Sequence, residues 1–283
     1  MFTLVAGTGY TGRRVLDALP HGESFGLSRS AIESDRPFAV VDFDTFDALP
    51  VALPESFAVL YTCPPDGMRD ERLRRFVAAL PRRPDRFVYI STTGVYGDCR
   101  GAVVTEETPV NPGNRMAKPR VDAEDFLRGW TTDLVVLRVP GIYGPGRLGV
   151  DRLAAGEACL RDADANPGNR IHVDDLVACC LAALSVDTPS GTFNVGDGDH
   201  RSATWFAGEV ARQAGLPEPR QISRDQAAEE FSSMRLAFLA ASRKVDTTKM
   251  REILGVRPRT PEQGIRDSLG EERPQGGPSR VRT

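Results

Sequence analysis

The fold is decided near the start of the chain by the stretch Val5-Ala6-Gly7-Thr8-Gly9-Tyr10-Thr11-Gly12. Apolar residues 2–5 predict a short strand before it, and the spacing of Val15, Leu16 and Leu19 predicts a helix after it. Between a strand and a helix, a G-x-G-x-x-G string is typical of dinucleotide binding. Its glycines permit a tight turn, a close approach to pyrophosphate, and close packing of helix on strand. We therefore expect residues 7–12 to cradle a dinucleotide phosphate at the positive helix end.

Apolar runs of strand length alternate with helical patterns along most of the chain. The predicted strands are 2–5, 24–27, 38–41, 58–62, 87–91, 134–139 and 192–195. The predicted helices are 12–19, 70–80, 121–130, 173–184, 203–214, 247–254 and 262–269. Such alternation builds a parallel sheet with helices on both faces, and the strands are apolar throughout, as burial on both faces requires. We predict an α/β fold with a Rossmann-type, doubly wound parallel sheet.

The regular alternation stops after the last predicted strand. We expect residues 1–195 to form the dinucleotide-binding domain. Residues 196–269, with the loop at 144–168, are expected to form a small, mostly helical lobe that closes over the carboxyl edge of the sheet. Residues 270–283 are rich in Gly, Pro, Arg and Glu and are predicted to be disordered.

Composition excludes several classes of protein. The 283 residues carry 36 basic and 39 acidic side chains, a net charge of −3, which argues against nucleic acid or an anionic membrane as the main partner. No apolar stretch is long enough to span a bilayer, and Met1 runs directly into the first strand, so no signal peptide is expected. The five cysteines form no C-x-x-C pair, so we expect no metal site, no disulfide framework, and a cytoplasmic location.

Four further strings, in this order along the chain, carry a resemblance to a known family. They are Phe87-Val-Tyr-Ile-Ser-Thr-Thr-Gly-Val-Tyr-Gly97, Arg138-Val-Pro-Gly-Ile-Tyr-Gly-Pro-Gly-Arg147, Arg170-Ile-His-Val-Asp-Asp-Leu176 and Gly191-Thr-Phe-Asn-Val-Gly196. Over about residues 1–269 the chain resembles extended short-chain dehydrogenases/reductases of the NAD-dependent epimerase/dehydratase branch. The resemblance implies NAD(P) across the carboxyl ends of the strands and a Ser/Thr–Tyr–Lys mechanism. In that chemistry the tyrosine exchanges a proton with a substrate oxygen while hydride moves, and lysine lowers the phenol pKa.

The active-site pattern of that family is incomplete here. Thr92, four residues before Tyr96, matches the Ser/Thr that holds the substrate oxygen, and Lys118 fits the lysine of the Y-x-x-x-K motif. Asn114 stands where the tyrosine belongs, and no tyrosine occurs between Tyr96 and Tyr143. Either of those two hydroxyls is a candidate replacement acid/base, and the alternative for each is a buried aromatic with a satisfied hydroxyl. The Asn114 amide cannot ionise but can orient substrate or a water.

Pro119 alters the geometry expected at Lys118. Proline disfavours helical dihedrals in the preceding residue and is favourable at the first helical position, so we expect the helix to begin at Pro119. Lys118 is then either a contact for the nicotinamide ribose or a solvated cation of the first turn. Thr92 likewise either holds substrate or bonds to backbone at the end of its strand.

The end of the second predicted strand bears on the choice of cofactor. Proteins that bind NAD place an acidic side chain there for the ribose 2′-hydroxyl, whereas this chain offers Arg29 between Ser28 and Ser30. A guanidinium binds phosphate bidentately, so NADP is expected to be preferred over NAD. The rival acidic group, Glu33, lies slightly further along and beyond the strand.

Other strand ends complete the predicted cofactor site. Asp42 resembles the family's contact to the adenine amine, with a surface carboxylate as the alternative, and Cys63 is expected to be an inert packing residue. The resemblance places the remaining contacts at Asp42, Thr62, Cys63, Pro64, Lys118, Pro140 and Tyr143.

Charged residues further along the chain allow two more interpretations. His172 with Asp174 and Asp175 invites a metal or catalytic role, but the simpler prediction is that one of the two acids begins the following helix. Arg147 and Arg170 either face the pocket and attract an anionic or sugar-nucleotide substrate, or lie on the surface.

The sequence predicts an NAD(P)-dependent oxidoreductase that acts on a carbonyl or secondary alcohol of a small molecule. Sugar-nucleotide epimerisation is less favoured, because it needs a competent base and residues 149–170 leave little room for a large substrate lobe. The alternative, which Asn114 keeps open, is a protein that binds NADP(H) and reports redox state without turnover. Family analogy adds a possible homodimer.

Overall fold

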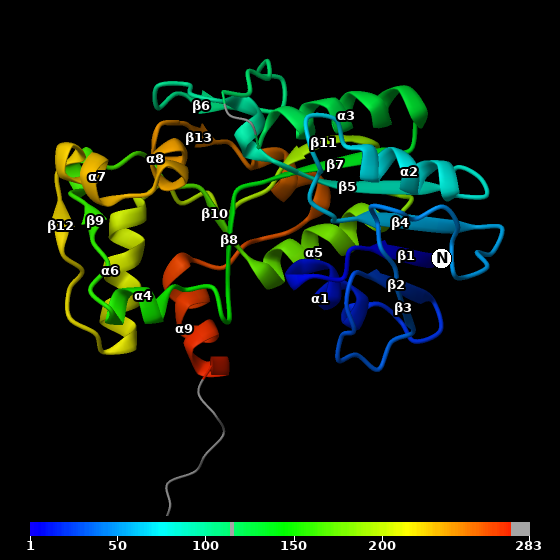
Figure 1. The fold of residues 1–283 in the computed structure, drawn as a ribbon, viewed down its shortest axis with the longest axis horizontal. Helices are drawn as coiled ribbons and strands as arrows, with labels where there is room; N and C mark the ends of the chain where they lie inside the picture. The colour runs from blue at the N-terminus through cyan, green and yellow to red at the C-terminus, as the bar shows by residue number, and fades with distance from the viewer. Residues whose placement is uncertain (114–115, 273–283) are drawn as a thin grey trace, which may run out of the picture.

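A seven-stranded sheet forms the centre of the computed structural model, which describes residues 1–113 and 116–272 (Figure 1). Neighbouring strands all run parallel in the order β3-β2-β1-β4-β5-β7-β11, so the chain winds outward from β1, crosses back to β4 and winds outward again. The strands are β1 (Phe2–Ala6), β2 (Ser24–Ser28), β3 (Phe38–Val40), β4 (Phe57–Tyr61), β5 (Arg86–Thr92), β7 (Leu134–Val139) and β11 (Gly191–Asn194). Each matches a predicted strand to within one residue, and the predicted doubly wound Rossmann-type fold is confirmed.

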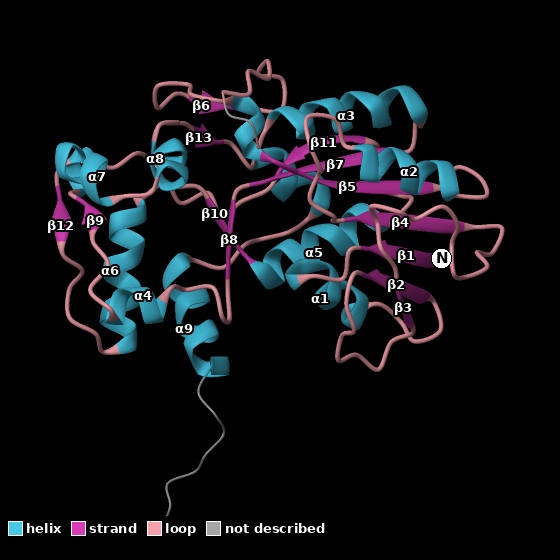
Figure 2. Ribbon diagram, in the orientation of Figure 1, coloured by secondary structure: helices cyan, strands magenta, loops and turns pink. Residues whose placement is uncertain are grey.

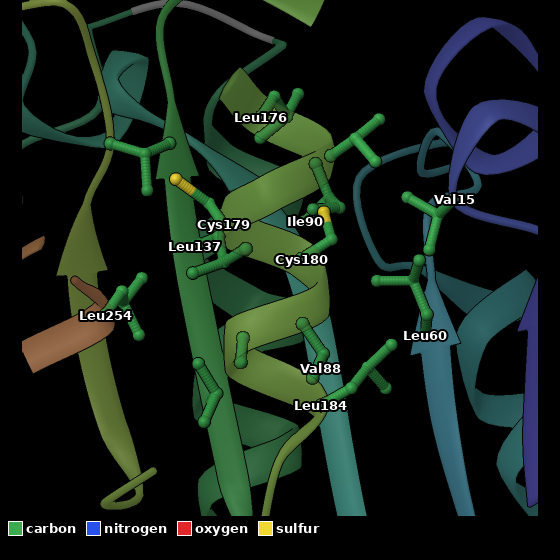
Figure 3. Close-up of a cluster of buried hydrophobic side chains, with 14 of the residues drawn as sticks. Val15, Leu60, Val88, Ile90, Leu137, Leu176, Cys179, Cys180, Leu184 and Leu254 are labelled. Carbon is green, nitrogen blue, oxygen red and sulfur yellow. The ribbon is translucent and has the colours of Figure 1, made fainter. Parts of the chain in front are cut away.

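Helices cover both faces of the sheet. They are α1 (Tyr10–Ala18) and α5 (Val173–Leu184) on one face, and α2 (Glu71–Ala79) and α3 (Lys118–Trp130) on the other. In Figure 3, α5 lays Leu176, Cys179 and Leu184 against β5 and β7. Because side chains alternate across a strand, Val88 of β5 joins this layer while its neighbour Phe87 packs under α2 and α3. Burial on both faces is the main stabilisation of such a sheet.

A smaller lobe lies beyond the carboxyl ends of the strands (Figures 1 and 2). It contains α4 (Val150–Ala154), α6 (Ala203–Ala214), α7 (Arg224–Glu230), α8 (Ser233–Leu239), α9 (Pro261–Glu272) and the parallel pair β9 (Cys159–Leu160) and β12 (Gln221–Ile222). Leu160 packs with Ile222 and Phe231, so residues from the 144–168 loop share a hydrophobic core with the C-terminal part of the chain.

Two short strand pairs and two turns connect the lobe to the sheet. They are β8 (Gly141–Tyr143) with β10 (Arg170–His172), β6 (Val103–Val104) with β13 (Lys244–Val245), the 3₁₀ turn η1 (Thr93–Tyr96) and the π-helical turn η3 (Met250–Leu254). A second 3₁₀ turn, η2 (Asp162–Asp164), follows β9. The paired strands have two or three residues each, too few for a hydrophobic period, so the sequence analysis did not predict them. The predicted helix 247–254 is present in part, as the π-helical turn η3.

Several element boundaries differ from the predictions, and α1 begins at Tyr10, two residues before its predicted start. Helix α3 begins at Lys118, and Pro119 is its second residue, where the missing N–H also costs no intrahelical bond. Helix α5 is capped by His172, whose Nδ1 accepts the Asp174 N–H at 3.2 Å, and not by either aspartate. Helix α9 runs to Glu272, so residues 270–272 are helical and the rest of the predicted tail lies outside the described residues. Within the ranges that the structure describes, no helix is both long and apolar enough to cross a membrane.

A buried charge network ties α3 to the sheet. Glu124 accepts from Arg138 of β7 at 2.7 Å and from Ser91 of β5 at 2.5 Å. Arg138 also donates to the Tyr96 hydroxyl at 2.9 Å, and this hydroxyl donates to Asn194 of β11 at 2.7 Å. Burial alone would raise the pKa of Glu124, but its hydrogen bonds to Arg138 and Ser91 and the Arg138 charge hold that pKa below its usual value.

The change Glu124→Gln is expected to lower the free energy of unfolding at neutral pH by about 3 kcal/mol, because it leaves the Arg138 charge buried without its counter-ion. The contribution of an acid whose pKa is lowered is lost as pH falls, so the gap from wild type should narrow below pH of about 4. Urea unfolding at neutral pH and below a pH of about 4 measures the difference in the free energy of unfolding. Asp125→Asn, at an exposed neighbour paired with Arg128, is the matched control and should change stability by about 0.5 kcal/mol or less. Equal effects of the two changes would contradict the role of the network.

Candidate cofactor site

A cleft of about 430 Å³ lies over the carboxyl ends of β1, β2, β4 and β5. This is the point where the winding of the sheet changes direction, between β1 and β4, and ligands of such sheets bind there. Most of the predicted cofactor contacts line this cleft: Gly7, Thr8, Gly9, Tyr10, Thr11, Ser28, Arg29, Ser30, Thr62, Cys63 and Pro64. The structure therefore brings residues from four strand ends into one cavity.

The three glycines of the loop have different surroundings. Gly7 has φ of +93°, and a Cβ there would lie 2.8 Å from the Cys63 Sγ. A Cβ on Gly12 would lie 2.1 Å from the Gly7 carbonyl oxygen, so only glycine lets α1 approach β1 this closely. A Cβ on Gly9 would meet no atom within 4 Å, because Gly9 borders the open cleft. These are the turn, the close packing and the open approach that a pyrophosphate site requires.

The first turn of α1 offers backbone donors to this cleft. Gly7 and Thr8 give their N–H groups to the Leu27 carbonyl, and the first intrahelical bond runs from Arg13 to Gly9. The N–H groups of residues 10–12 consequently have no intrahelical acceptor, and Gly9 supplies no side-chain cap. The first turn also carries no acidic residue. This donor set fits the phosphates of a dinucleotide.

At one end of the cleft the residues suit an adenosine. Arg29 is exposed there, with no hydrogen bond or ion pair to any residue in 1–113 or 116–272. Glu33 is exposed and does not line the cleft. Asp42 is also exposed and outside the lining, and its carboxylate accepts the Asp44 N–H at 3.0 Å, which matches the surface alternative. Phe43, beside it, does line the cleft, although the sequence analysis did not single it out.

The end of β4 forms the floor of the cleft. The Thr62 hydroxyl donates to the carbonyl oxygens of Gly7 and, at 3.4 Å, of Ala6, so it fixes the glycine loop to β4. Burial raises the pKa of the Cys63 thiol to about 12. A thiol with such a pKa stays protonated near neutral pH, as expected of an inert packing residue.

The other end of the cleft is lined by Ile90, Ile142, Arg120 and Arg147. Lys118 is exposed and lies outside the lining, which matches the solvated alternative for this residue. Arg120 was missed by the sequence analysis, although it lies three and four residues before Ala123 and Glu124 on the buried face of α3. That helical spacing was the available signal.

The predicted catalytic hydroxyls are not gathered at this end. Thr92 is half-buried at the end of β5, where its Oγ1 accepts the Gly94 N–H at 3.1 Å, the backbone-bonding alternative. The Tyr96 hydroxyl lies in the Arg138 network and does not line the cleft, so its position argues against the acid/base role. Asn114 lies outside the described residues.

Tyr143 and Pro140 also lie outside the cleft lining. Tyr143 is buried in the core of the lobe beside Val210 and Ile265, and a Cβ on Gly264 would lie 2.4 Å from its hydroxyl oxygen. Its ring therefore packs against α9, and burial raises the pKa of its phenol. Both tyrosines are thus buried aromatics, but only Tyr96 matches the alternative to catalysis in full, because the Tyr143 hydroxyl has no hydrogen-bond partner among the residues described.

A second cavity, of about 450 Å³, lies within the lobe, between its 147–169 segment and residues 203–207 and 231–241. Arg147 lines both this cavity and the cofactor cleft. Its guanidinium lies 3.8 Å from the centre of the Tyr10 ring, and Tyr10 donates to the Pro145 carbonyl at 2.9 Å, so the glycine loop holds this residue in place. Arg170 lines neither cavity, because it is buried and donates to the Arg201 and Ser202 carbonyls.

His172 has a structural role. Its Nε2 lies 3.1 Å from the Ser268 hydroxyl, but its Nδ1 accepts the Asp174 N–H, and Ser268 donates to the Gly264 carbonyl at 2.6 Å. A histidine with Nδ1 as acceptor must present Nε2–H to the serine, so it cannot activate that hydroxyl as a base. No three His, Cys, Asp or Glu side chains are grouped to hold a metal within the described part of the chain.

The chain was compared with known proteins. Residues 72–196 match the model of the NAD dependent epimerase/dehydratase family. Protein YeeZ of Escherichia coli K12 is 31% identical over 193 residues, which cover 65% of this chain and 67% of that protein. The chain belongs to the NAD-dependent epimerase/dehydratase family. Another member, the human dTDP-D-glucose 4,6-dehydratase, is 24% identical over 145 residues, which cover 47% of this chain and 41% of the human protein.

Solved structures share the fold of this chain. A functionally unknown conserved protein from Silicibacter pomeroyi DSS superposes with a TM-score of 0.79 at 28% identity, covering 96% of this chain and 99% of that one. MoeE5, solved with UDP-glucose and NAD, superposes with a TM-score of 0.73 at 19% identity, covering 95% and 98%, which shows a shared fold.

Two alanine substitutions in the glycine loop should separate its packing role from its binding role. Gly12→Ala places a Cβ against the Gly7 carbonyl, so we expect a lower melting temperature. Gly9→Ala meets no protein atom but intrudes on the cleft, so we expect unchanged melting and at least about tenfold weaker nicotinamide dinucleotide binding. Thermal unfolding and fluorescence titration measure the two effects. A Gly9→Ala protein that binds as tightly as wild type would show that no ligand approaches this backbone.

Proposed function

We propose that the cleft binds NADP(H) and that the chain is an oxidoreductase acting on a carbonyl or secondary alcohol of a small molecule. The supporting observation is the cleft itself, in which the glycine loop and three other strand ends combine with the unpaired N–H groups of α1. Family membership agrees with a nicotinamide cofactor. When bound, the cofactor would accept or supply hydride, and the chain would hold both partners in place.

Arg29 supports NADP over NAD. It lies at the end of β2, where the adenosine ribose is held in this fold, and its charge has no counter-ion among the residues described. The Ser28 and Ser30 side chains border it in the same lining. An exposed guanidinium flanked by hydroxyls suits a 2′-phosphate, and Glu33, which would suit a 2′-hydroxyl, does not reach the cleft.

The second cavity is the proposed place of the substrate. It adjoins the cofactor cleft at Arg147, and its lining adds Arg152 and the pair Arg235–Glu157. With three arginines and one glutamate, this lining favours an anionic substrate. The family resemblance assigns Thr92 to hold the reacting oxygen; its side chain lines neither cavity, but its hydroxyl hydrogen is not used by the Gly94 contact. The proton would be exchanged with a water.

The second candidate is NADP(H) binding without turnover. The observation that favours it is that Tyr96 and Tyr143 are both buried away from the cleft and Lys118 faces solvent. A protein of this kind would keep the dinucleotide site and report its redox state to a partner.

Arg29→Ala should weaken NADPH binding about 10- to 100-fold, the value of a lost charge-assisted contact to phosphate. NADH binding should change less than about twofold, because NADH has no 2′-phosphate. Fluorescence titration with both cofactors measures this. Arg13→Ala is the matched control, because Arg13 is an exposed arginine of α1 that does not line the cleft. Tighter binding of NADH than NADPH by the wild type would contradict the assignment.

Turnover separates the two candidates. Small carbonyl compounds with a carboxylate or phosphate should be screened for NADPH consumption. With the best substrate, Thr92→Ala is expected to lower kcat at least about tenfold. Tyr96→Phe and Tyr143→Phe should stay within about threefold, because the Tyr96 hydroxyl is bonded to Arg138 and Asn194 and the Tyr143 ring is packed in the core of the lobe. Micromolar NADPH binding with no turnover of any compound would favour the non-catalytic candidate.

A further inference from the structure

The geometry points to Arg120 as the residue that binds the ribose hydroxyls and adjacent phosphate of the nicotinamide half of the cofactor. This inference rests on the proposed function, since it assumes that a dinucleotide occupies the cleft. It assigns that contact to a residue of α3 other than Lys118, on which the sequence motif placed it.

The sheet fixes which half of the ligand Arg120 would meet. Arg29 marks the adenosine end of the cleft above β2, so a dinucleotide that crosses the sheet at β1 places its other half above β4 and β5. Arg120 lies at that point. Its Nη1 donates to the Ile90 carbonyl of β5 at 2.7 Å and to the Cys63 carbonyl after β4 at 3.4 Å.

The guanidinium is held in one orientation before any ligand arrives. Besides the two carbonyls, Nη1 donates to the Tyr89 hydroxyl at 3.2 Å, and the guanidinium carbon lies 5.6 Å from the centre of the Tyr89 ring. The backbone at Arg120 is fixed in the first turn of α3 by its N–H bond to the Ala117 carbonyl. A donor held in this way loses little side-chain entropy on binding.

Donors of Arg120 remain for a ligand. The hydrogen bonds to protein groups are made by Nη1, and within residues 1–113 and 116–272 Nη2 and Nε have no acceptor. Arg120 also forms no ion pair with a carboxylate of those residues. The cleft therefore has a half-buried cation beside its floor, with a planar pair of donors that suits vicinal hydroxyls and a phosphate oxygen.

Lys118 provides the contrast. It is exposed and does not line the cleft, although it precedes Arg120 by only two residues. Residues two apart on a helix point in different directions, so only one of them can face the sheet. Because a guanidinium offers donors and no acceptor, Arg120 would bind and orient the cofactor.

The experiment compares whole and half cofactors. Arg120→Ala should weaken NADPH binding at least about tenfold. Binding of adenosine 2′,5′-bisphosphate, which lacks the nicotinamide half, should stay within about twofold. Lys118→Ala is the matched control and should change neither affinity. Arg29→Ala should weaken both ligands, which shows that the half cofactor occupies the adenosine end. Isothermal titration calorimetry gives the affinities, and thermal unfolding shows that the variants are folded.

Two results would overturn the inference: unchanged NADPH affinity in Arg120→Ala, or an equal loss for both ligands, which would mean that Arg120 only supports the cleft. If Arg120→Ala does not fold, Arg120→Lys keeps a cation and a donor and should lose affinity about three- to tenfold for NADPH alone. If the wild type binds neither ligand, the proposed function fails instead, so the two failures are distinguishable.

Discussion

The structure depends on one close contact, the approach of α1 to β1 across the Gly7 carbonyl. A side chain at Gly12 would overlap that oxygen, and a side chain at Gly7 would overlap the residues that end β4. The same proximity directs the unpaired N–H groups of the first helical turn toward the space above the sheet. Thr62 strengthens the arrangement by bonding to the loop from the neighbouring strand. Close packing and the free N–H groups above the sheet are thus two results of one backbone geometry.

The end of the cleft above β4 and β5 keeps the expected backbone but is not lined by the expected tyrosine hydroxyls. The β5 strand and the turn after it have the expected positions, but the Tyr96 hydroxyl is bonded to Arg138 and Asn194 and stabilises the junction of β5, β7 and β11. The cleft instead has Arg120 and Arg147 beside apolar Ile90 and Ile142. This lining favours binding and orientation of anions more than proton exchange by a phenol.

Sequence reasoning worked where burial imposes a simple pattern. The central strands are apolar on both faces, and the glycine spacing has a steric cause. The sheet, the crossing helices and the part of the cleft formed by the glycine loop could therefore be predicted. Sequence reasoning failed where a contact joins residues that are far apart in the sequence. The β9–β12 pair has two residues in each strand, and Tyr143 and Gly264 meet only through packing of the lobe. The motif spacing predicted Lys118 as the cation of α3 at the cleft. The helix instead places Arg120 in the cleft lining and leaves Lys118 exposed.

Arg147 connects ligand binding in the cofactor cleft with ligand binding in the second cavity. Its guanidinium borders both the cofactor cleft and the second cavity, and it contacts the ring of Tyr10 in the glycine loop. An anion bound at either site changes the electrostatic potential at the other through this shared charge. By thermodynamic linkage, the factor by which the first ligand changes the affinity for the second equals the factor by which the second changes the affinity for the first.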